Sequence, residues 1–312
     1  MANEIIFLFG AGASRGALHI DPCDPPLGRE VYDRLAECFP NEWGHDSRLG
    51  RYGNKLRENF ERTMFKEVCR WEPSISILEW QRKMTLYFSR FTPKSTSNNL
   101  FTKLLEFLRD TLIISNSIFA SLNYDCVFEQ AAYRLGFQVD YSCNEIENNG
   151  IRILKVHGSC NFITENIQSR MPYLTNTNSQ IDCGMECLQP VDVEKVLERR
   201  FSDANAFYYP VMSLYSFGRN SLVAGTRIQK IRNTWSGYVS RASLIVVIGV
   251  KPNCEDTHVW NPIKETKSAN LFYIGSQEDF KIWASANSNF KFLAEEFNDG
   301  FESLLRILDS KF

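Results

Sequence analysis

Four groups of glycine and polar residues in this sequence have types and spacings that suit chemistry. The first, Gly10-Ala11-Gly12-Ala13-Ser14-Arg15-Gly16, directly follows the apolar run 4–9. A glycine turn lets the backbone approach a pyrophosphate closely, and the following helix directs its free N–H groups and positive dipole end at that charge. The spacing Gly-x-Gly-x-x-x-Gly departs from the ordinary dinucleotide fingerprint, so the turn alone does not identify a nucleotide.

The other three groups also stand where short apolar runs end. They are Asn123-Tyr124-Asp125 after 117–121, His157-Gly158-Ser159 after 151–156, and Gly249-Val250 at the end of 243–250. The uninterrupted apolar run at 4–9 is typical of a strand buried on both faces of a parallel sheet, and we expect the other three runs to be strands as well. Because an open parallel sheet binds its ligand at the carboxyl ends of its strands, we expect these groups to share one site.

The hydrophobic pattern predicts the elements that position these groups. Strands are expected at 4–9, 117–121, 137–141, 151–156, 243–250 and 271–274, the last of them ending in Gly275-Ser276. Apolar residues at helical spacing predict helices at 74–91, 101–112, 127–135, 191–201, 228–239 and 290–312. We therefore predict an α/β fold with a Rossmann-like, mostly parallel sheet that carries helices on both faces.

Two stretches do not fit a simple alternation of strands and helices. No strand pattern stands out between residues 28 and 115, which we interpret as a helical insertion. Residues 160–225 are rich in Asn, Ser and Tyr and are interpreted as an irregular insertion. The core of a single domain, 1–312, then consists of 1–27, 116–159 and 226–312.

Composition excludes several classes of function. The 312 residues include 35 Lys+Arg and 37 Asp+Glu, a net charge of -2, which gives no general electrostatic basis for binding nucleic acid or a membrane. No apolar run approaches the roughly 20 residues of a membrane-spanning helix. The first predicted strand begins at residue 4, which leaves no room for a signal peptide, and nine irregularly spaced cysteines favour reduced thiols and a cytoplasmic location.

Taken together, the four groups resemble the motifs of the SIR2 (sirtuin-like) family. Residues 10–14 match the family's Gly-Ala-Gly-x-Ser motif, and 121–125 correspond to its Thr-Gln-Asn-Ile-Asp motif. Residues 155–159 correspond to its His-Gly motif, and 248–250 to the glycine strand end that follows. The resemblance implies a Rossmann-like fold with NAD⁺ as the bound nucleotide, and it places 271–276 near the adenosine half.

Departures from the family pattern select among its activities. Deacylating sirtuins carry two Cys-x-x-Cys pairs that bind zinc, whereas Cys183 and Cys187 are the only close pair here, and their spacing is wrong. Cys143 and Cys160 do not supply a convincing second pair, so no metal is expected. The glutamine of the deacylase motif is Leu122, and no Gly-Ile-Pro-Asp-Phe-Arg segment follows the first glycines. Both changes resemble the SIR2-like proteins of bacterial anti-phage defence, which hydrolyse NAD⁺.

The resemblance assigns roles to single residues. His157 would be the catalytic base, since a neutral imidazole accepts a proton near neutral pH. Asn123, with donor and acceptor atoms, would orient a ribose hydroxyl, the nicotinamide amide or the attacking water. Asp125 would anchor its loop, and Ser14 with the backbone of residues 11–16 would hold phosphates. The sequence leaves open whether Arg15 adds charge there or points to solvent. The full cofactor-binding set is Gly10, Ala11, Gly12, Ser14, Arg15, Asp125, Gly158, Gly249, Val250, Gly275 and Ser276.

The interpretation is thus an NAD⁺ hydrolase that releases nicotinamide and ADP-ribose and depletes NAD⁺ in defence. Two alternatives stay open: an NAD-dependent protein deacylase, and a non-catalytic module that senses NAD or ADP-ribose. The resemblance further implies a homo-oligomer and a regulatory partner such as a HerA-type ATPase, and it does not decide between NAD and NADP. His19, His45 and His258 are interpreted as surface or structural residues.

Overall fold

The computed structural model describes residues 4–94, 98–141, 150–166, 182–203, 207–213, 221–266, 269–284 and 289–311. Its main sheet has seven strands in the order β12-β11-β10-β1-β4-β6-β5, and every neighbouring pair is parallel. The strands are β1 (Glu4–Phe9), β4 (Ser117–Ser121), β5 (Gln138–Asp140), β6 (Gly150–Lys155), β10 (Ala242–Ile248), β11 (Asn270–Ile274) and β12 (Phe290–Ala294). The predicted α/β class with a parallel Rossmann-like sheet is confirmed.

Strand β1 is central, and the order of the sheet reverses beside it. The chain passes from β1 to β4 and then to β6 on one side, whereas β10, β11 and β12 follow one another on the other side. Ligands of open α/β sheets bind at such a switch point, outside the carboxyl ends of the strands. The glycine turn follows β1, so it lies at this point of the sheet.

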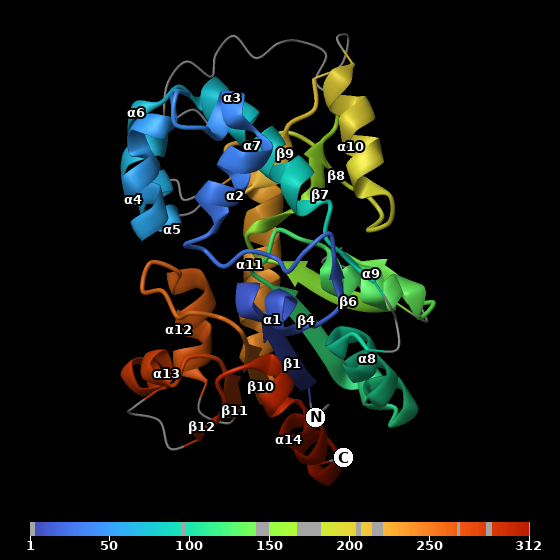
Figure 1. Ribbon diagram of the computed structural model, residues 1–312. Helices are drawn as coiled ribbons and strands as arrows, with labels where there is room; N and C mark the ends of the chain where they lie inside the picture. Colours follow the sequence, from blue (N-terminus) through green and yellow to red (C-terminus); the bar gives the residue numbers. More distant parts are fainter. Residues whose placement is uncertain are drawn as a thin grey trace.

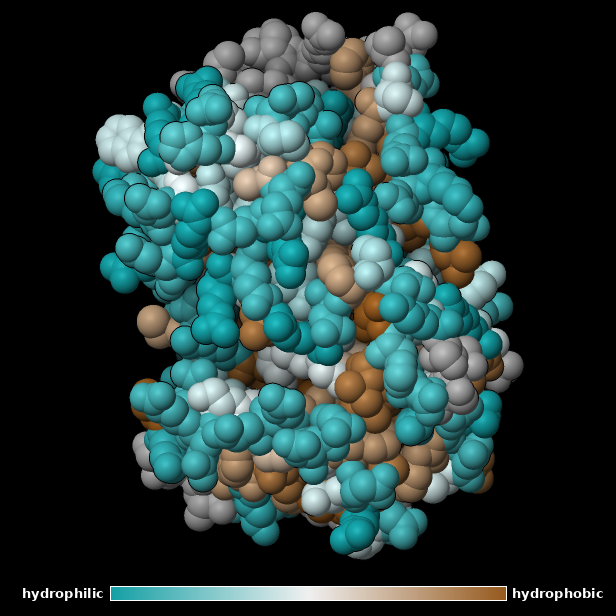
Figure 2. Space-filling model, in the orientation of Figure 1, coloured by the Kyte–Doolittle hydropathy of each residue, from teal (hydrophilic) through white to brown (hydrophobic). Residues whose placement is uncertain are grey.

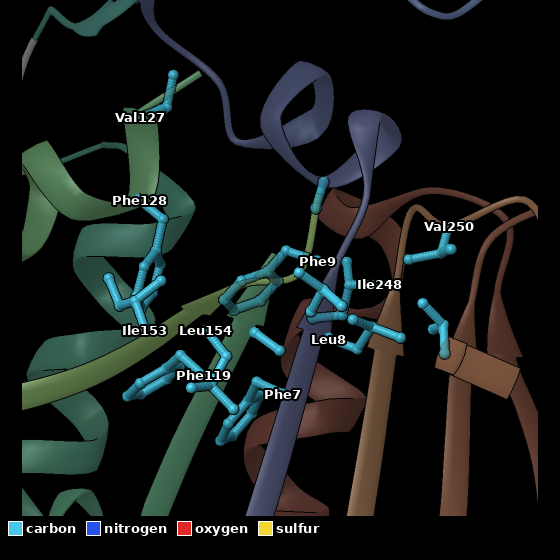
Figure 3. Close-up of a cluster of buried hydrophobic side chains, with 14 of the residues drawn as sticks. Phe7, Leu8, Phe9, Phe119, Val127, Phe128, Ile153, Leu154, Ile248 and Val250 are labelled. Atoms are coloured by element: carbon cyan, nitrogen blue, oxygen red, sulfur yellow. The ribbon is translucent and has the colours of Figure 1, made fainter. Parts of the chain in front are cut away.

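Helices cover both faces of the sheet. On one face α8 (Leu100–Asp110), α9 (Val127–Arg134) and α14 (Phe297–Lys311) pack through aromatic rings. The ring of Phe128 lies 4.8 Å from those of both Phe9 and Phe119, and Phe101 contacts Phe9 at 5.1 Å. On the other face α11 (Gly225–Val239) packs on β1 and β10. Figure 3 shows this apolar cluster below the turn that follows β1, so closely packed side chains support the strand ends.

A second group of elements lies beyond the carboxyl edge of the sheet (Figure 1). It contains the helices α2 to α7, which follow α1 (Ala11–Gly16), and the helix α10 (Val193–Ser202). Five of these are short, namely α2 (Val31–Cys38), α3 (Pro40–Trp43), α4 (Gly53–Glu58), α5 (Phe60–Thr63) and α6 (Cys69–Trp71), and α7 (Ser74–Phe88) is long. Two-residue strands β2 (Ile20–Asp21) and β3 (Thr92–Pro93) pair near their base. These helices stand over the edge at which the strand-end groups gather.

The segment after His157 contains strands that the sequence did not predict. Strand β7 (Gly158–Thr164) pairs with β8 (Met185–Cys187) and β9 (Pro210–Met212), both antiparallel, and all seven residues of β7 are buried. Its sequence, Gly-Ser-Cys-Asn-Phe-Ile-Thr, does not alternate, and the burial of its polar residues arises from partners distant in the chain. The predicted helix near 191–201 is confirmed as α10. Much of 160–225, and Cys143, lie outside the described residues.

The end of the sheet also differs from expectation. The sequence predicted 271–274 as the last strand and a helix from 290, whereas 290–294 form the edge strand β12 and α14 begins at Phe297. A short apolar run does not distinguish strand from helix by its period, and pairing with β11 decides the matter. The remaining helices are α12 (Thr257–Glu265) and α13 (Gln277–Ala284).

In the view of Figure 2, hydrophilic side chains predominate over helices α2 to α5. Within the described part of the chain, none of the helices combines the length and apolarity that crossing a bilayer requires.

Candidate active site

The glycine turn packs directly on the end of β10. The N–H of Gly10 donates to the Ile248 carbonyl and that of Gly12 to the Gly249 carbonyl, both at 2.9 Å. Gly249 has φ of +63°, and a Cβ on it would lie 2.0 Å from the backbone nitrogen of Ala13. No other residue fits at Gly249, because both the left-handed conformation and the contact exclude a side chain. These two hydrogen bonds fix the position of the glycine turn relative to the end of β10.

Asn123 ties the end of β4 to this turn. Its side-chain Nδ2 donates to the Gly10 carbonyl at 2.8 Å and to Ser14 Oγ at 2.9 Å, and the residue is only 8% exposed. A carbonyl oxygen accepts hydrogen bonds only, so the nitrogen of the amide must face Gly10, and its Oδ1 must face away. Among the described residues, this Oδ1 receives no hydrogen bond. The acceptor of the amide therefore remains for a ligand.

Asp125 anchors the same loop from beneath. Its Oδ1 accepts from Ser14 Oγ at 3.0 Å and from the N–H of Val127, the first residue of α9, at 3.1 Å. Burial raises the pKa of this carboxyl, and the nearby Lys155 acts in the opposite direction. The hydroxyl of Ser14 is thus engaged by Asn123 and Asp125, so its contribution to a phosphate would come from its backbone.

A buried cation supports the loop. Lys155, at the end of β6, is fully buried and donates to the Asp125 carbonyl at 2.7 Å, and it pairs with Glu129 at 2.9 Å. Burial lowers the pKa of Lys155, but Glu129, Cys126 and Asp125 together outweigh this effect and hold the pKa above its ordinary value. In the sequence, Lys155 stands within the motif 155–159, whose pattern indicates no role for it.

His157 follows β6 as Asn123 follows the neighbouring strand β4. Ser121 of β4 pairs with Lys155 of β6, and Asn123 and His157 each follow two residues later. The imidazole is buried, at 3% exposure, and its Nε2 lies 3.2 Å from Asp256 Oδ1 and 3.1 Å from His258 Nε2. Asn123 and His157 therefore lie at the same carboxyl edge of the sheet, after adjacent strands.

Sequence reasoning missed Asp256 and His258. His258 was interpreted as a surface or structural residue, yet its ring lies beside that of His157, with centroids 5.2 Å apart. The sequence signal was weak, because Asp256 and His258 do not directly follow β10, which ends at Ile248, and His258 already lies in α12.

The other predicted binding residues occupy strand ends in different ways. Gly158 has φ of +78°, and a Cβ on it would lie 2.1 Å from the Val211 carbonyl. The carbonyl of buried Val250 accepts from the Tyr273 hydroxyl at 2.7 Å, and the N–H of Gly275 donates to Ala294 at 2.9 Å. The hydroxyl of Ser276 accepts a hydrogen bond from the Asp279 N–H in the first turn of α13, so it caps that helix. Ala11 begins α1.

Arg15 points to the helical insertion. Its guanidinium forms an ion pair with Glu30, whose carboxylate also accepts from the Leu27 N–H at 3.1 Å. The two side chains are 40% and 31% exposed. Arg15 therefore has a protein partner, which is neither of the two predicted alternatives, a phosphate or solvent.

We expect Arg15→Gln to lower the free energy of unfolding by no more than about 1 kcal/mol, because half-exposed ion pairs contribute about 0–1 kcal/mol. Urea denaturation measures this change. Glu30→Gln removes the other partner of the same pair and is the matched control, so the two variants should agree. If Arg15→Gln weakens nucleotide binding and Glu30→Gln does not, the guanidinium contacts a phosphate instead.

Potential metal ligands come together at one place in the described residues. The ligand atoms of His157, Asp256 and His258 all lie within 4.8 Å of one another. Within the same residues, Cys183 and Cys187 join no such group. Only cysteines were candidate metal ligands in the sequence, so this cluster was not predicted.

Comparisons with known proteins identify the fold. No protein-family model and no curated protein sequence matches the chain. Among solved structures, a Sir2 homologue in complex with NAD aligns with a TM-score of 0.51 and 11% identity, over 98% of this chain and 90% of that one. Sir2 in complex with the inhibitor EX-527, 2'-O-acetyl-ADP-ribose and a deacetylated p53 peptide aligns with a TM-score of 0.46 and 16% identity, over 98% and 93%. At such identities the likeness concerns the fold alone, and the first alignment supports it: this chain has a SIR2-like fold.

Proposed function

We propose that the protein binds NAD⁺ at the carboxyl edge of its main sheet and hydrolyses the bond between nicotinamide and ribose. The observation that carries this proposal is the network Ser14–Asn123–Asp125. It joins the glycine turn after β1 to the end of β4 and leaves one amide oxygen for a ligand. His157 follows the next strand, β6, at the position that corresponds to Asn123 after β4. A phosphate cradle and a polar pair thus flank the switch point of the sheet.

The glycine turn would receive the pyrophosphate. A Cβ on Gly10 or Gly12 would lie 2.5 or 2.8 Å from backbone atoms of Gly249, so these two glycines let the turn pack closely on the end of β10. Since their N–H groups are bonded to β10, the turn is held before the nucleotide arrives. A preformed site loses less conformational entropy on binding.

Asn123 and His157 would act on the ribose. Cleavage of the nicotinamide bond builds positive charge on the ribose, and water then attacks the same carbon. The Asn123 Oδ1 can accept a hydrogen bond from a ribose hydroxyl or from the attacking water, which fixes its orientation. His157 can accept the proton released by that water. The Asp256 carboxylate, 3.2 Å from the ring, stabilises the imidazolium that forms.

Product analysis tests this proposal. Purified protein is incubated with NAD⁺ in the presence of a chelator, and nicotinamide and ADP-ribose are followed by chromatography. We expect equal amounts of both products from wild-type protein without any acylated peptide. Asn123→Ala is expected to lose most of this release, since it removes the amide that orients the reactants.

The two alternative functions give different results. A deacylase releases nicotinamide only when an acetylated peptide is added, and it yields acetyl-ADP-ribose. A sensor binds NAD⁺ without forming products. If wild type and Asn123→Ala release nicotinamide equally slowly, with and without peptide, the hydrolase proposal is wrong.

A further inference from the structure

Three side chains that suit a metal ion gather at His157. His157 Nε2 lies 3.1 Å from His258 Nε2 and 3.2 Å from Asp256 Oδ1. His157 and Asp256 are buried, at 3% and 4% exposure, and His258 is partly buried. His157 follows β6, whereas Asp256 and His258 lie between β10 and the first turn of α12. The cluster therefore connects strand ends on the two sides of β1 and β4.

The geometry calls for a cation at the centre of this cluster. Each imidazole Nε2 can present a lone pair, and a carboxylate oxygen presents only lone pairs. One proton on His157 Nε2 forms a well-aligned hydrogen bond with one of its two neighbours. A metal ion accepts lone pairs from all three. Neighbouring ligands of a tetrahedral zinc ion with bonds of about 2.0 Å are about 3.3 Å apart, close to the two separations at His157.

We propose that His157, Asp256 and His258 bind a divalent transition-metal ion, with Zn²⁺ the best fit, and that this ion holds His157 inactive. Two imidazoles and one carboxylate are a ligand set that zinc prefers, and they leave a fourth position for water. Binding itself is independent of the proposed hydrolase activity, whereas the inhibition rests on it.

The loop that carries two of the ligands is held in place. The Asp256 carbonyl accepts from the N–H groups of Val259 and Trp260 at 2.9 and 3.0 Å, which fixes the start of α12. Glu255 pairs with Lys66 of the helical insertion at 3.3 Å. A held loop presents its ligands with little loss of entropy, which favours binding at this site.

An ion at this site would change what His157 can do. A neutral imidazole that binds a metal through Nε2 carries its proton on Nδ1, so neither nitrogen of His157 could then accept a proton from water or from a ribose hydroxyl. Asp256 would be engaged by the same ion and could not stabilise an imidazolium. Metal would therefore hold the protein in a resting state, and its removal would release the base.

Zinc titration of the metal-free full chain tests the site without NAD⁺. The protein is stripped with a chelator and titrated with Zn²⁺ in competition with a chromogenic chelator. We expect one tight site per chain in wild-type protein. His258→Ala and Asp256→Asn should each weaken it by at least about 100-fold, because even outer-shell partners of a metal ligand contribute about 10- to 100-fold. Circular dichroism verifies that both variants are folded.

Matched controls separate this site from other zinc ligands. His45 is exposed and lies 3.1 Å from Asp46, so it forms a histidine–carboxylate pair with no second histidine. His45→Ala should bind zinc as wild type does. Cys254 is exposed and close in sequence to Asp256, and Cys254→Ser should also bind normally. When Co²⁺ replaces Zn²⁺, the absorption spectrum of the protein should indicate nitrogen and oxygen ligands and should lack a thiolate charge-transfer band.

Each contrary outcome has a defined meaning. Equal binding by wild type, His258→Ala and Asp256→Asn, or no binding at all, overturns the site. Weakening by Cys254→Ser alone assigns the ion to a thiol and overturns it as well. If the site binds zinc but the zinc-loaded protein releases nicotinamide as fast as the metal-free protein, or faster, the inhibitory role is wrong. If the chelated wild type releases no nicotinamide, the hydrolase proposal fails while the titration still decides the site.

Discussion

Replacing His157 by alanine is expected to slow nicotinamide release by about 10²- to 10⁴-fold, the usual contribution of a positioned general base. The effect is large because the ring is held at one place: it is buried and contacts Asp256 and His258 at 3.2 and 3.1 Å. A water molecule that replaces the imidazole would have neither its basicity nor its position. Initial rates with a chelator present, at saturating NAD⁺, measure the change.

His45→Ala is the matched control for this measurement. The side chain of His45 is 95% exposed and its nearest charged partner is Asp46, so its loss should leave the rate at the wild-type level. Thermal unfolding of both variants distinguishes loss of the base from loss of the fold. If His157→Ala retains more than about a tenth of the wild-type rate, His157 is not the general base.

Replacing Lys155 by methionine is expected to lower the free energy of unfolding by about 3–5 kcal/mol, the cost of leaving a buried charge without its partner. Lys155 is fully buried, Glu129 is 1% exposed, and their charged atoms lie 2.9 Å apart. Methionine fills a similar volume but removes the ammonium, so the Glu129 carboxylate loses the cation that compensates it. Urea denaturation followed by circular dichroism gives the free energy.

The double variant Lys155→Met/Glu129→Leu is the decisive comparison. Two apolar residues of similar volume often replace a buried ion pair with little loss, so the double variant should recover most of the stability. The Asp125 carbonyl still loses its bond to Lys155, and full recovery is not expected. If the double variant is less stable than Lys155→Met, Glu129 contributes through contacts other than this pair.

Local sequence pattern predicted most of the main sheet. The runs at 4–9, 117–121 and 243–250 are apolar and unbroken, and the structure places them as β1, β4 and β10, side by side at the centre. Such strands are recognisable because a central parallel strand is buried on both faces and must be apolar throughout. The glycine turn, Asn123 and His157 then follow, since each stands directly after one of the predicted strands.

Edge strands were harder to predict for a physical reason. Strand β12 pairs on one side only, with β11, and its residues after Phe290 are exposed or half-buried. Its pattern of apolar and charged residues fits a helix as well as a strand. Strand β7 was not recognised for a different reason: its buried Ser159 and Asn161 donate their hydrogen bonds to Tyr124, Tyr141 and Leu188, which lie in other parts of the chain.

The sequence by itself determined the α/β fold and the strand ends that carry the glycine turn, Asn123, Asp125 and His157, because burial on both faces and close backbone approach leave direct marks on residue type. Only the tertiary structure decided which atoms of these residues remain for a ligand. It placed Asp256 and His258 against His157, paired Lys155 with Glu129, and turned Arg15 toward Glu30. Such contacts join residues as many as 101 positions apart in the chain, and no local pattern records a partner that only the folded sheet brings near.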